Sequence, residues 1–261
     1  MSSHNPYVAF RFRNFRLLFT ATTLSVVGGL LESTALGWEL YERTGSALTL
    51  GNVGLAEFLP VRYALAAKGI ACLARTHSRD PDDVSKVCDS FDGVVVPYVE
   101  EVEHARRLAA AAIYRPLKGQ ALDRLLSTGE WPSEQTRQYV QTERCVNTVF
   151  VPMIESLRGI ENLDRICGID GVHAVFVGPN DLTSTMGVPN EYDHPDLIAQ
   201  LQRIIDTAAR SHVSAGCWFG KRSQAERTIR QGARFIVYSN DGALLKEALE
   251  QSFAALRQTM K

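Results

Sequence analysis

The sequence predicts an α/β fold built on a parallel sheet. From residue 69 onward, short apolar runs of strand length alternate with longer stretches that have helical spacing. The unit over residues 149–186 shows this most clearly, because the apolar runs Val149–Ile154 and Ala174–Val177 flank a helical stretch, Ser156–Gly168. Two strands joined through a helix run parallel, so their carboxyl ends lie at the same edge of the sheet.

Taken in order, the same pattern gives six strands and seven helices. The strands are expected near residues 70–74, 93–96, 149–154, 174–177, 215–219 and 235–238. The helices are expected from Asp80 or Pro81, over Val102–Ile113, Glu134–Arg144, Ser156–Gly168, Pro195–Arg210 and Gln224–Gln231, and from Ala243 to about Thr259. The segment 114–133 reads as a loop.

Two carboxylates follow neighbouring strands of this sheet. Glu155 comes directly after the strand at 149–154, and Asp181 comes just after the strand at 174–177. Both are therefore expected at one rim, where α/β folds place their chemistry. Oxygen ligands that converge at such a rim suit a hard divalent cation, with Mg²⁺ or Mn²⁺ favoured and Co²⁺ as an alternative. The competing interpretation of Asp181 is a helix-capping acid.

The wording around these carboxylates, MIES and VFVGPNDL with the acids 26 positions apart, resembles the HpcH/HpaI aldolase/citrate lyase family. The resemblance runs from about Gly69 to the carboxyl terminus. It implies a metal-dependent (class II) pyruvate aldolase on a (β/α)8 TIM-barrel fold. Since only six of eight strands are recognisable, the barrel is expected to be incomplete, with the first two strands missing.

The resemblance also assigns roles to individual residues. Glu155 and Asp181 are the implied metal ligands, and the turn containing Gly178, Asn180 and Asp181 is the implied binding site for a 2-oxo acid carboxylate such as that of pyruvate. Arg75, at the end of CLART, is implied to hold the oxo oxygen and to stabilise an enolate. Asp89 is implied to reach a neighbouring subunit's site, which requires a homo-oligomer; a surface acid at a helix end is the alternative.

Three departures weaken the implied activity. The family's base histidine has no counterpart, since His4 is the only histidine before residue 69 and His77 reads as a loop residue. Met153 replaces a glutamine that is common in the family, and PLKGQALDRLL replaces a glycine-rich loop. Without a general base, the expected loss of rate is roughly 10² to 10⁴-fold.

The first 60 residues differ in composition from the rest. Three arginines precede Leu17–Leu31, a run of fifteen residues without a charge, and if Glu32 is tolerated the segment reaches Leu40. A membrane span needs about 20 residues. The stretch through YERTGSAL to Pro60 resembles the beginning of a major facilitator superfamily transporter. A signal peptide and a helix pair packed on the barrel are the alternatives.

Bulk composition excludes other classes. The formal net charge is −1, which gives no electrostatic case for nucleic acid, and the five cysteines are widely spaced and odd in number. We therefore expect a cytoplasmic protein with reduced thiols and possible membrane contact through residues 17–40.

The sequence thus predicts two domains, a hydrophobic helical segment at 1–68 and an aldolase-type α/β barrel at 69–261. The predicted function is a carbon–carbon lyase that cleaves 4-hydroxy-2-oxo acids to pyruvate and an aldehyde. Two alternatives stand beside it. One is a non-catalytic, membrane-tethered module that binds an oxo acid or a metal, and the other is a non-functional fusion of transporter and aldolase fragments.

Overall fold

The structure is a computed structural model that describes residues 59–259 and short stretches between residues 11 and 43 (11–13, 16–17, 20–21, 24, 38–39 and 42–43). The chain divides into two units, Met1–Lys68 and Gly69–Lys261. In the first unit, the structure describes helix α3 (Leu59–Ala66). Apart from the scattered positions, the predicted hydrophobic helix at 17–40 and the transporter-like stretch lie outside the described residues. Within the described part, no helix has the length and apolar character that a membrane span requires.

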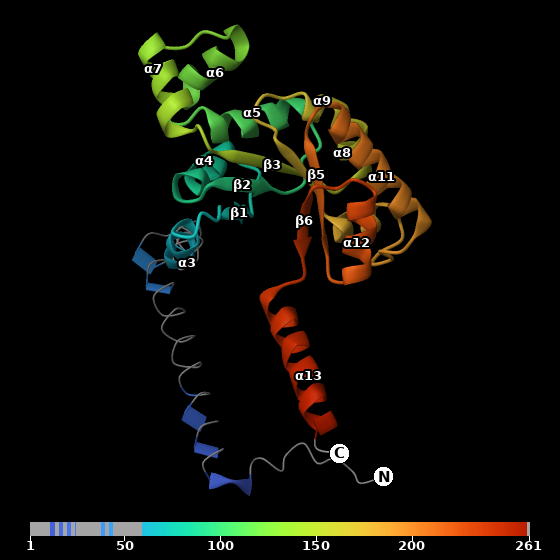
Figure 1. Ribbon diagram of the computed structural model, residues 1–261. Helices are drawn as coiled ribbons and strands as arrows, with labels where there is room; N and C mark the ends of the chain where they lie inside the picture. The colour runs from blue at the N-terminus through green and yellow to red at the C-terminus, as the bar shows by residue number, and fades with distance from the viewer. Residues whose placement is uncertain are drawn as a thin grey trace. The chain divides into compact units, whose positions relative to one another are not determined.

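The second unit is built on a parallel sheet of six strands in chain order, which confirms the α/β prediction (Figure 1). The strands are β1 (Leu73–Arg75), β2 (Gly93–Val96), β3 (Val149–Ile154), β4 (Ala174–Val177), β5 (Ser214–Phe219) and β6 (Phe235–Tyr238). Among the described strands, β1 pairs only with β2 and β6 pairs only with β5. The sheet is therefore a curled, open part of a barrel.

Helices connect the strands around the outside of this sheet (Figure 1). They are α4 (Pro81–Ser90), α5 (Val102–Ile113), α6 (Gly119–Thr128), α7 (Glu134–Gln138), the π-helix η2 (Tyr139–Arg144), α8 (Leu157–Glu161), α9 (Leu163–Cys167), α10 (Pro179–Thr185), α11 (Pro195–Arg210), α12 (Arg222–Arg230) and α13 (Asp241–Thr259). Helix α4 begins as its sequence predicts, because the Asp80 side chain accepts from the backbone N–H of Asp82 and Pro81 occupies the first turn.

Two expectations about helices were wrong. Residues 114–133 are not all loop, since α6 lies there and is capped by Gly129, whose positive φ of 74° suits the left-handed helix cap. The stretch 156–168 is not one helix but two. Asn162 separates α8 from α9, and its side-chain amide donates to the carbonyl of Glu100 at 2.8 Å. This contact with another loop fixes the break, and helical periodicity alone cannot show it.

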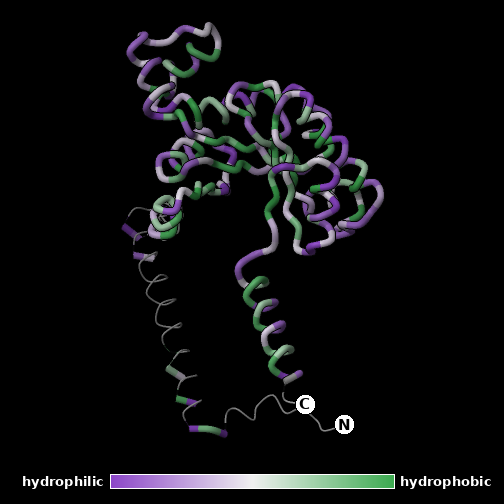
Figure 2. The backbone as a smooth tube through the Cα atoms, in the orientation of Figure 1, coloured by the Kyte–Doolittle hydropathy of each residue, from purple (hydrophilic) through white to green (hydrophobic). Residues whose placement is uncertain are grey.

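The strands are apolar on both faces, as a sheet covered by crossover helices requires (Figure 2). On the outer face, Phe150 and Ile154 are fully buried against the helical layer, in which Leu108 and Ile166 are fully buried as well. The inner, concave face carries a second cluster, formed by Val151, Met153, Ala174 and Phe176, with Val95, Val149, Trp218 and Phe235 packed against it. Glu155 continues the alternation of Val151 and Met153, so it emerges on the inner side of the sheet.

Candidate active site

The carboxyl ends of three strands place the predicted functional residues at one rim of the sheet. Arg75 is the last residue of β1, Glu155 follows β3 directly, and Asp181 lies in the first turn of α10 after β4. Because all six strands are parallel, these ends share one edge. Glu155 and Asp181 interact electrostatically with each other, and Arg75 interacts with Glu155. The structure thus brings these three predicted residues together.

Glu155 is held in place by backbone groups. Its side chain is only 1 % exposed, and its Oε1 atom accepts a hydrogen bond of 2.7 Å from the backbone N–H of Tyr98. Its Oε2 atom is buried and has no hydrogen-bond partner among the described residues. Oε2 lies against Gly178, where an added Cβ would overlap the carboxylate. One oxygen is therefore anchored and the other is left for a further ligand.

The environment of Glu155 raises the pKa of its carboxyl group toward neutral pH. Burial, together with the nearby charge of Asp181, raises the pKa of Glu155 to about 7. The hydrogen bond from Tyr98 and the charge of Arg75 act in the opposite direction and lower it. A buried carboxylate beside a second carboxylate is costly unless a proton or a cation neutralises the pair. The site therefore favours a positive charge between Glu155 and Asp181.

Arg75 is exposed at the mouth of the site. Its Nε atom donates to the sulfur of Met153 at 3.4 Å, which is a weak hydrogen bond. Met153 occupies the position at which the family that the sequence resembles often has glutamine. Its sulfur atom contacts the arginine. Only the Nε atom is used in this contact, which leaves the two terminal NH2 groups of the guanidinium to donate to a substrate oxygen.

The turn after β4 lies beside Glu155 but is only partly directed at it. Gly178 touches the Glu155 carboxylate, whereas the Asn180 side-chain oxygen accepts a hydrogen bond of 3.2 Å from Tyr192. Asp181 is exposed at the rim. The role of this turn in binding a substrate carboxylate remains a prediction.

Asp89 lies away from this rim within its own chain. It is near the carboxyl end of α4, which runs back toward the amino ends of the strands, and it pairs with Arg144 at 2.6 Å and with buried Arg115 at 3.4 Å. A contribution from Asp89 to catalysis would have to reach another subunit, as the family resemblance implies.

A divalent cation fits the residues present. Within the described part of the chain, no third His, Cys, Asp or Glu joins Glu155 and Asp181 in a cluster able to hold a metal ion. The partnerless Oε2 atom of Glu155 and the adjacent Asp181 form a hard, anionic donor pair of the kind that Mg²⁺ and Mn²⁺ prefer. The remaining positions on such an ion would be filled by water or substrate.

Sequence reasoning missed Tyr98. Its contribution is a backbone N–H, and its φ of 54° lies in the left-handed region that usually favours glycine or asparagine. In this conformation the backbone N–H of Tyr98 points toward the Glu155 carboxylate and donates to it. A tyrosine after the strand VVVP gives no sequence signal for such a turn. The rim position of Glu155 was predictable, but the group that orients it was not.

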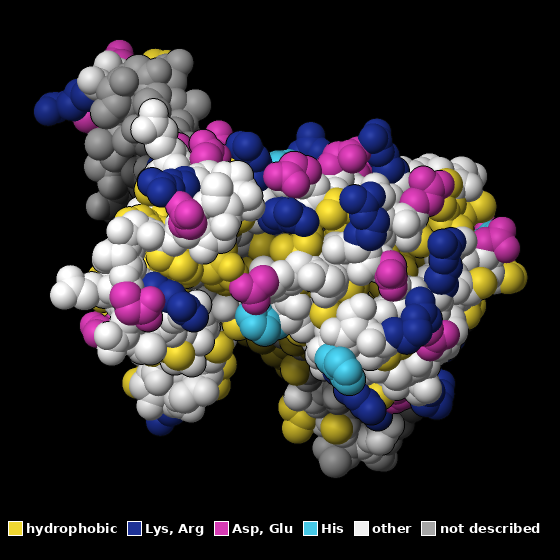
Figure 3. All heavy atoms as spheres, turned by 90° about the horizontal axis from the view of Figure 1, so that it is seen from above, with side chains coloured by type: hydrophobic (Ala, Val, Ile, Leu, Met, Phe, Trp, Pro, Cys, Tyr) yellow, Lys and Arg dark blue, Asp and Glu magenta, His cyan; other side chains and the backbone are white. Residues whose placement is uncertain are grey.

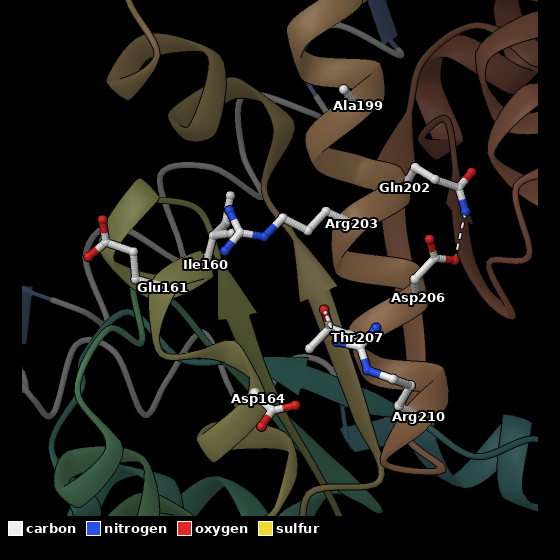
Figure 4. Close-up of a pocket in the computed structure, with 9 residues that line it drawn as sticks. All are labelled: Ile160, Glu161, Asp164, Ala199, Gln202, Arg203, Asp206, Thr207 and Arg210. Carbon is white, nitrogen blue, oxygen red and sulfur yellow. Dashed lines mark hydrogen bonds between the residues drawn. The ribbon is translucent and has the colours of Figure 1, made fainter.

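A groove lies elsewhere on the molecule, between outer helices. The groove has a volume of about 680 Å³ and lies between α11 on one side and α8 and α9 on the other (Figure 4). Its charged lining residues include Glu161, Asp164 and Arg203. These residues come from the outer helices and not from the strand ends. The volume of a groove therefore does not identify the active site. The buried carboxylate of Glu155 does.

The fold and the rim define the class: an enzyme-like α/β barrel fragment with an acidic pair at the carboxyl ends of its strands. The chain belongs to the HpcH/HpaI aldolase/citrate lyase family, whose sequence profile matches residues 64–248. A 5-keto-4-deoxy-D-glucarate aldolase of Escherichia coli O6:H1 is 25% identical over 200 residues, which are 76% of each chain.

Solved structures support the same assignment. The HpcH/HpaI aldolase of Desulfitobacterium hafniense DCB-2 matches 78% of each chain with a TM-score of 0.63 and 23% identity, which speaks to the fold alone. A family protein from Burkholderia cenocepacia J2315 matches 75% of this chain and 77% of its own, with a TM-score of 0.61 and 25% identity. The resemblance to this family is thereby confirmed, and the transporter resemblance of the first residues is not shown.

Proposed function

We propose that the chain is a metal-dependent carbon–carbon lyase that cleaves a 4-hydroxy-2-oxo acid to pyruvate and an aldehyde. One observation carries this proposal: a buried glutamate with a partnerless oxygen beside a second carboxylate, at the barrel rim next to an arginine. The name of the Escherichia coli relative, 5-keto-4-deoxy-D-glucarate aldolase, supports the aldolase type of reaction.

Glu155 and Asp181 would hold the cation, which supplies Lewis-acid polarisation of the 2-oxo group when bound. Arg75, whose charge acts on Glu155, would donate to the oxo oxygen and stabilise negative charge that develops there. In the cleavage, the C3–C4 bond breaks, the C4 hydroxyl gives its proton to water and becomes the aldehyde carbonyl, and C3 keeps the electron pair as the pyruvate enolate, which then takes a proton from water to give pyruvate. The Gly178–Asp181 turn is the proposed contact for the substrate carboxylate.

The family's base histidine, which would accept the proton, has no counterpart among the described residues. His77 is exposed in the loop after β1, and His104 contacts the backbone carbonyl of Arg79 at 2.8 Å. Neither residue reproduces the family's base, which follows a strand missing from the described sheet. This observation favours a second candidate function, a non-catalytic module that binds a metal ion and an oxo acid.

We also propose that the chain forms a homo-oligomer. Helix α13 carries large apolar side chains that are exposed in the single chain, including Leu245 at 63 % and Phe253 at 56 %. Asp89 would need such an assembly in order to approach a rim. An exposed apolar stripe of this kind marks a protein interface.

The decisive assay measures pyruvate release from a 4-hydroxy-2-oxo acid with Mg²⁺, Mn²⁺ or Co²⁺ added. We expect metal-dependent release that Glu155→Gln abolishes. Metal-dependent pyruvate binding without turnover would establish the binding module instead. A chain with no cooperative melt and neither property would support the fusion of two fragments.

A further inference from the structure

A second cavity lies at the opposite end of the strands from the carboxylate pair. It has a volume of about 410 Å³ and is formed by the end of α5, the segment from α6 to Trp131, and the end of α9 with the loop that follows it. Helix α5 begins after the carboxyl end of β2, and α9 lies between β3 and β4, so both helices end on the side of the amino ends of the strands. The volume lies within the range of about 300–1,000 Å³ that small-molecule sites occupy.

The floor of this cavity is apolar and the wall is aromatic. Ala110, Leu125 and Ile169 are buried residues of the lining. Tyr114 and Trp131 meet edge to face, with ring centroids 5.4 Å apart, and both are half-buried in the wall. The Tyr114 hydroxyl donates to Asp170 at 2.9 Å, so the ring is fixed by a polar contact at its outer end. Such a surface suits a flat or branched apolar group.

The lining of the cavity carries two arginines and one acid. Arg106 and Arg165 line it, and among the described residues neither has an ion-pair or hydrogen-bond partner. The acid in the lining, Asp170, is engaged by Tyr114. Burial and this hydrogen bond raise the pKa of Tyr114 to about 12, so the phenol stays protonated and continues to donate. The cavity therefore presents two available guanidinium groups beside an apolar floor. Figure 3 views this side of the molecule, where yellow apolar atoms show between blue and magenta charged side chains.

From this combination we propose a second ligand site, separate from the rim, that binds a small organic carboxylate with an apolar body. Arg106 and Arg165 pair with the carboxylate, and Trp131 packs against the apolar part. A free inorganic anion would leave the floor unused, and a neutral apolar compound would leave the arginines unused. The proposal does not depend on the lyase activity.

The test uses 3-phenylpropionate as the probe and its uncharged amide as the comparator, titrated by calorimetry into the full-length chain. We expect one site for the acid and at least about tenfold weaker binding of the amide, since a charge-assisted pair is lost. The double variant Arg106→Gln/Arg165→Gln should weaken binding of the acid by a similar factor. Arg107→Gln is the matched control, because Arg107 is the next residue of α5 and pairs with Asp123 at 3.8 Å. It should change the affinity less than about twofold.

A second measurement locates the bound probe. The acid should change the tryptophan fluorescence of the wild type, and Trp131→Phe should remove this change while calorimetry still detects binding. Binding should persist in Arg75→Gln, which alters only the rim. Equal affinity for acid and amide, equal losses in the Arg107 control and the double variant, no binding, or loss of binding in Arg75→Gln would each overturn the proposal.

Discussion

The Oε2 atom of Glu155 lies against the backbone of Gly178, so closely that no β-carbon could occupy position 178 without moving the carboxylate. The φ of Gly178 is −87°, which any residue can adopt. The glycine is thus required for close approach and not for an unusual backbone conformation. Through this contact, the position of the acid after β3 depends on the turn after β4.

Substitution of this glycine tests that relationship. Gly178→Ala should displace the Glu155 carboxylate and weaken Mn²⁺ binding by at least about tenfold, because a misplaced ligand loses its share of a charge-assisted contact. Gly168→Ala is the matched control, since the nearest atoms to its added Cβ lie at 3.6 Å, an ordinary contact distance. Calorimetric titration with Mn²⁺ checks both variants, and an unchanged affinity in Gly178→Ala would contradict the arrangement.

The raised pKa of Glu155 predicts a specific pH dependence of stability. The folded pKa of about 7 lies above the ordinary value of 4.5, so the folded chain binds more protons than the unfolded chain between these values. The free energy of unfolding of the metal-free protein should therefore fall as pH rises from about 4.5 to 7, by up to about 3 kcal/mol from this group.

Urea unfolding of the wild type and of Glu155→Gln across this pH range isolates the effect. The difference between the two proteins should change with pH, because glutamine does not titrate. Added Mg²⁺ should restore the stability of the wild type at pH 8 and leave the variant unaffected. A difference that is constant with pH would show that Glu155 titrates normally.

Arg75 should affect turnover more than metal binding. Arg75→Gln should lower kcat/KM for 4-hydroxy-2-oxo acid cleavage by about 10²- to 10³-fold, as loss of one group that stabilises an oxyanion does. Its Mn²⁺ affinity should stay within a few fold of wild type, since Arg75 is not placed as a ligand. Steady-state kinetics and titration together check this, and an equal loss in both quantities would contradict the assigned role.

The apolar stripe of α13 predicts an assembly that charge can break. Leu245→Glu/Phe253→Glu should reduce the molar mass in solution to that of one chain, because the carboxylates would have to be buried in the interface. Gln258→Glu on the same helix adds charge outside these two positions and should leave the mass unchanged. Light scattering after size exclusion measures the mass, and a wild type that is already monomeric would refute the oligomer.

The sequence was most informative where apolar runs are long and end in a charged residue. The runs that precede Glu155 and Asp181 predicted β3 and β4 with their bounds as observed, and the parallel direction of the two strands predicted that both acids lie at one rim. Three features depended on contacts distant in sequence: the break at Asn162, the backbone donor at Tyr98, and the close approach at Gly178. No local pattern encodes these contacts, because each joins loops that follow different strands.

The most direct test of the account is Mn²⁺ titration of the wild type, Glu155→Gln and Asp181→Asn in the presence of pyruvate. The account predicts one ion per wild-type chain and loss of that site in either variant. Binding that survives in both variants, or no Mn²⁺ binding by the wild type, would contradict the claim that these two carboxylates share a cation.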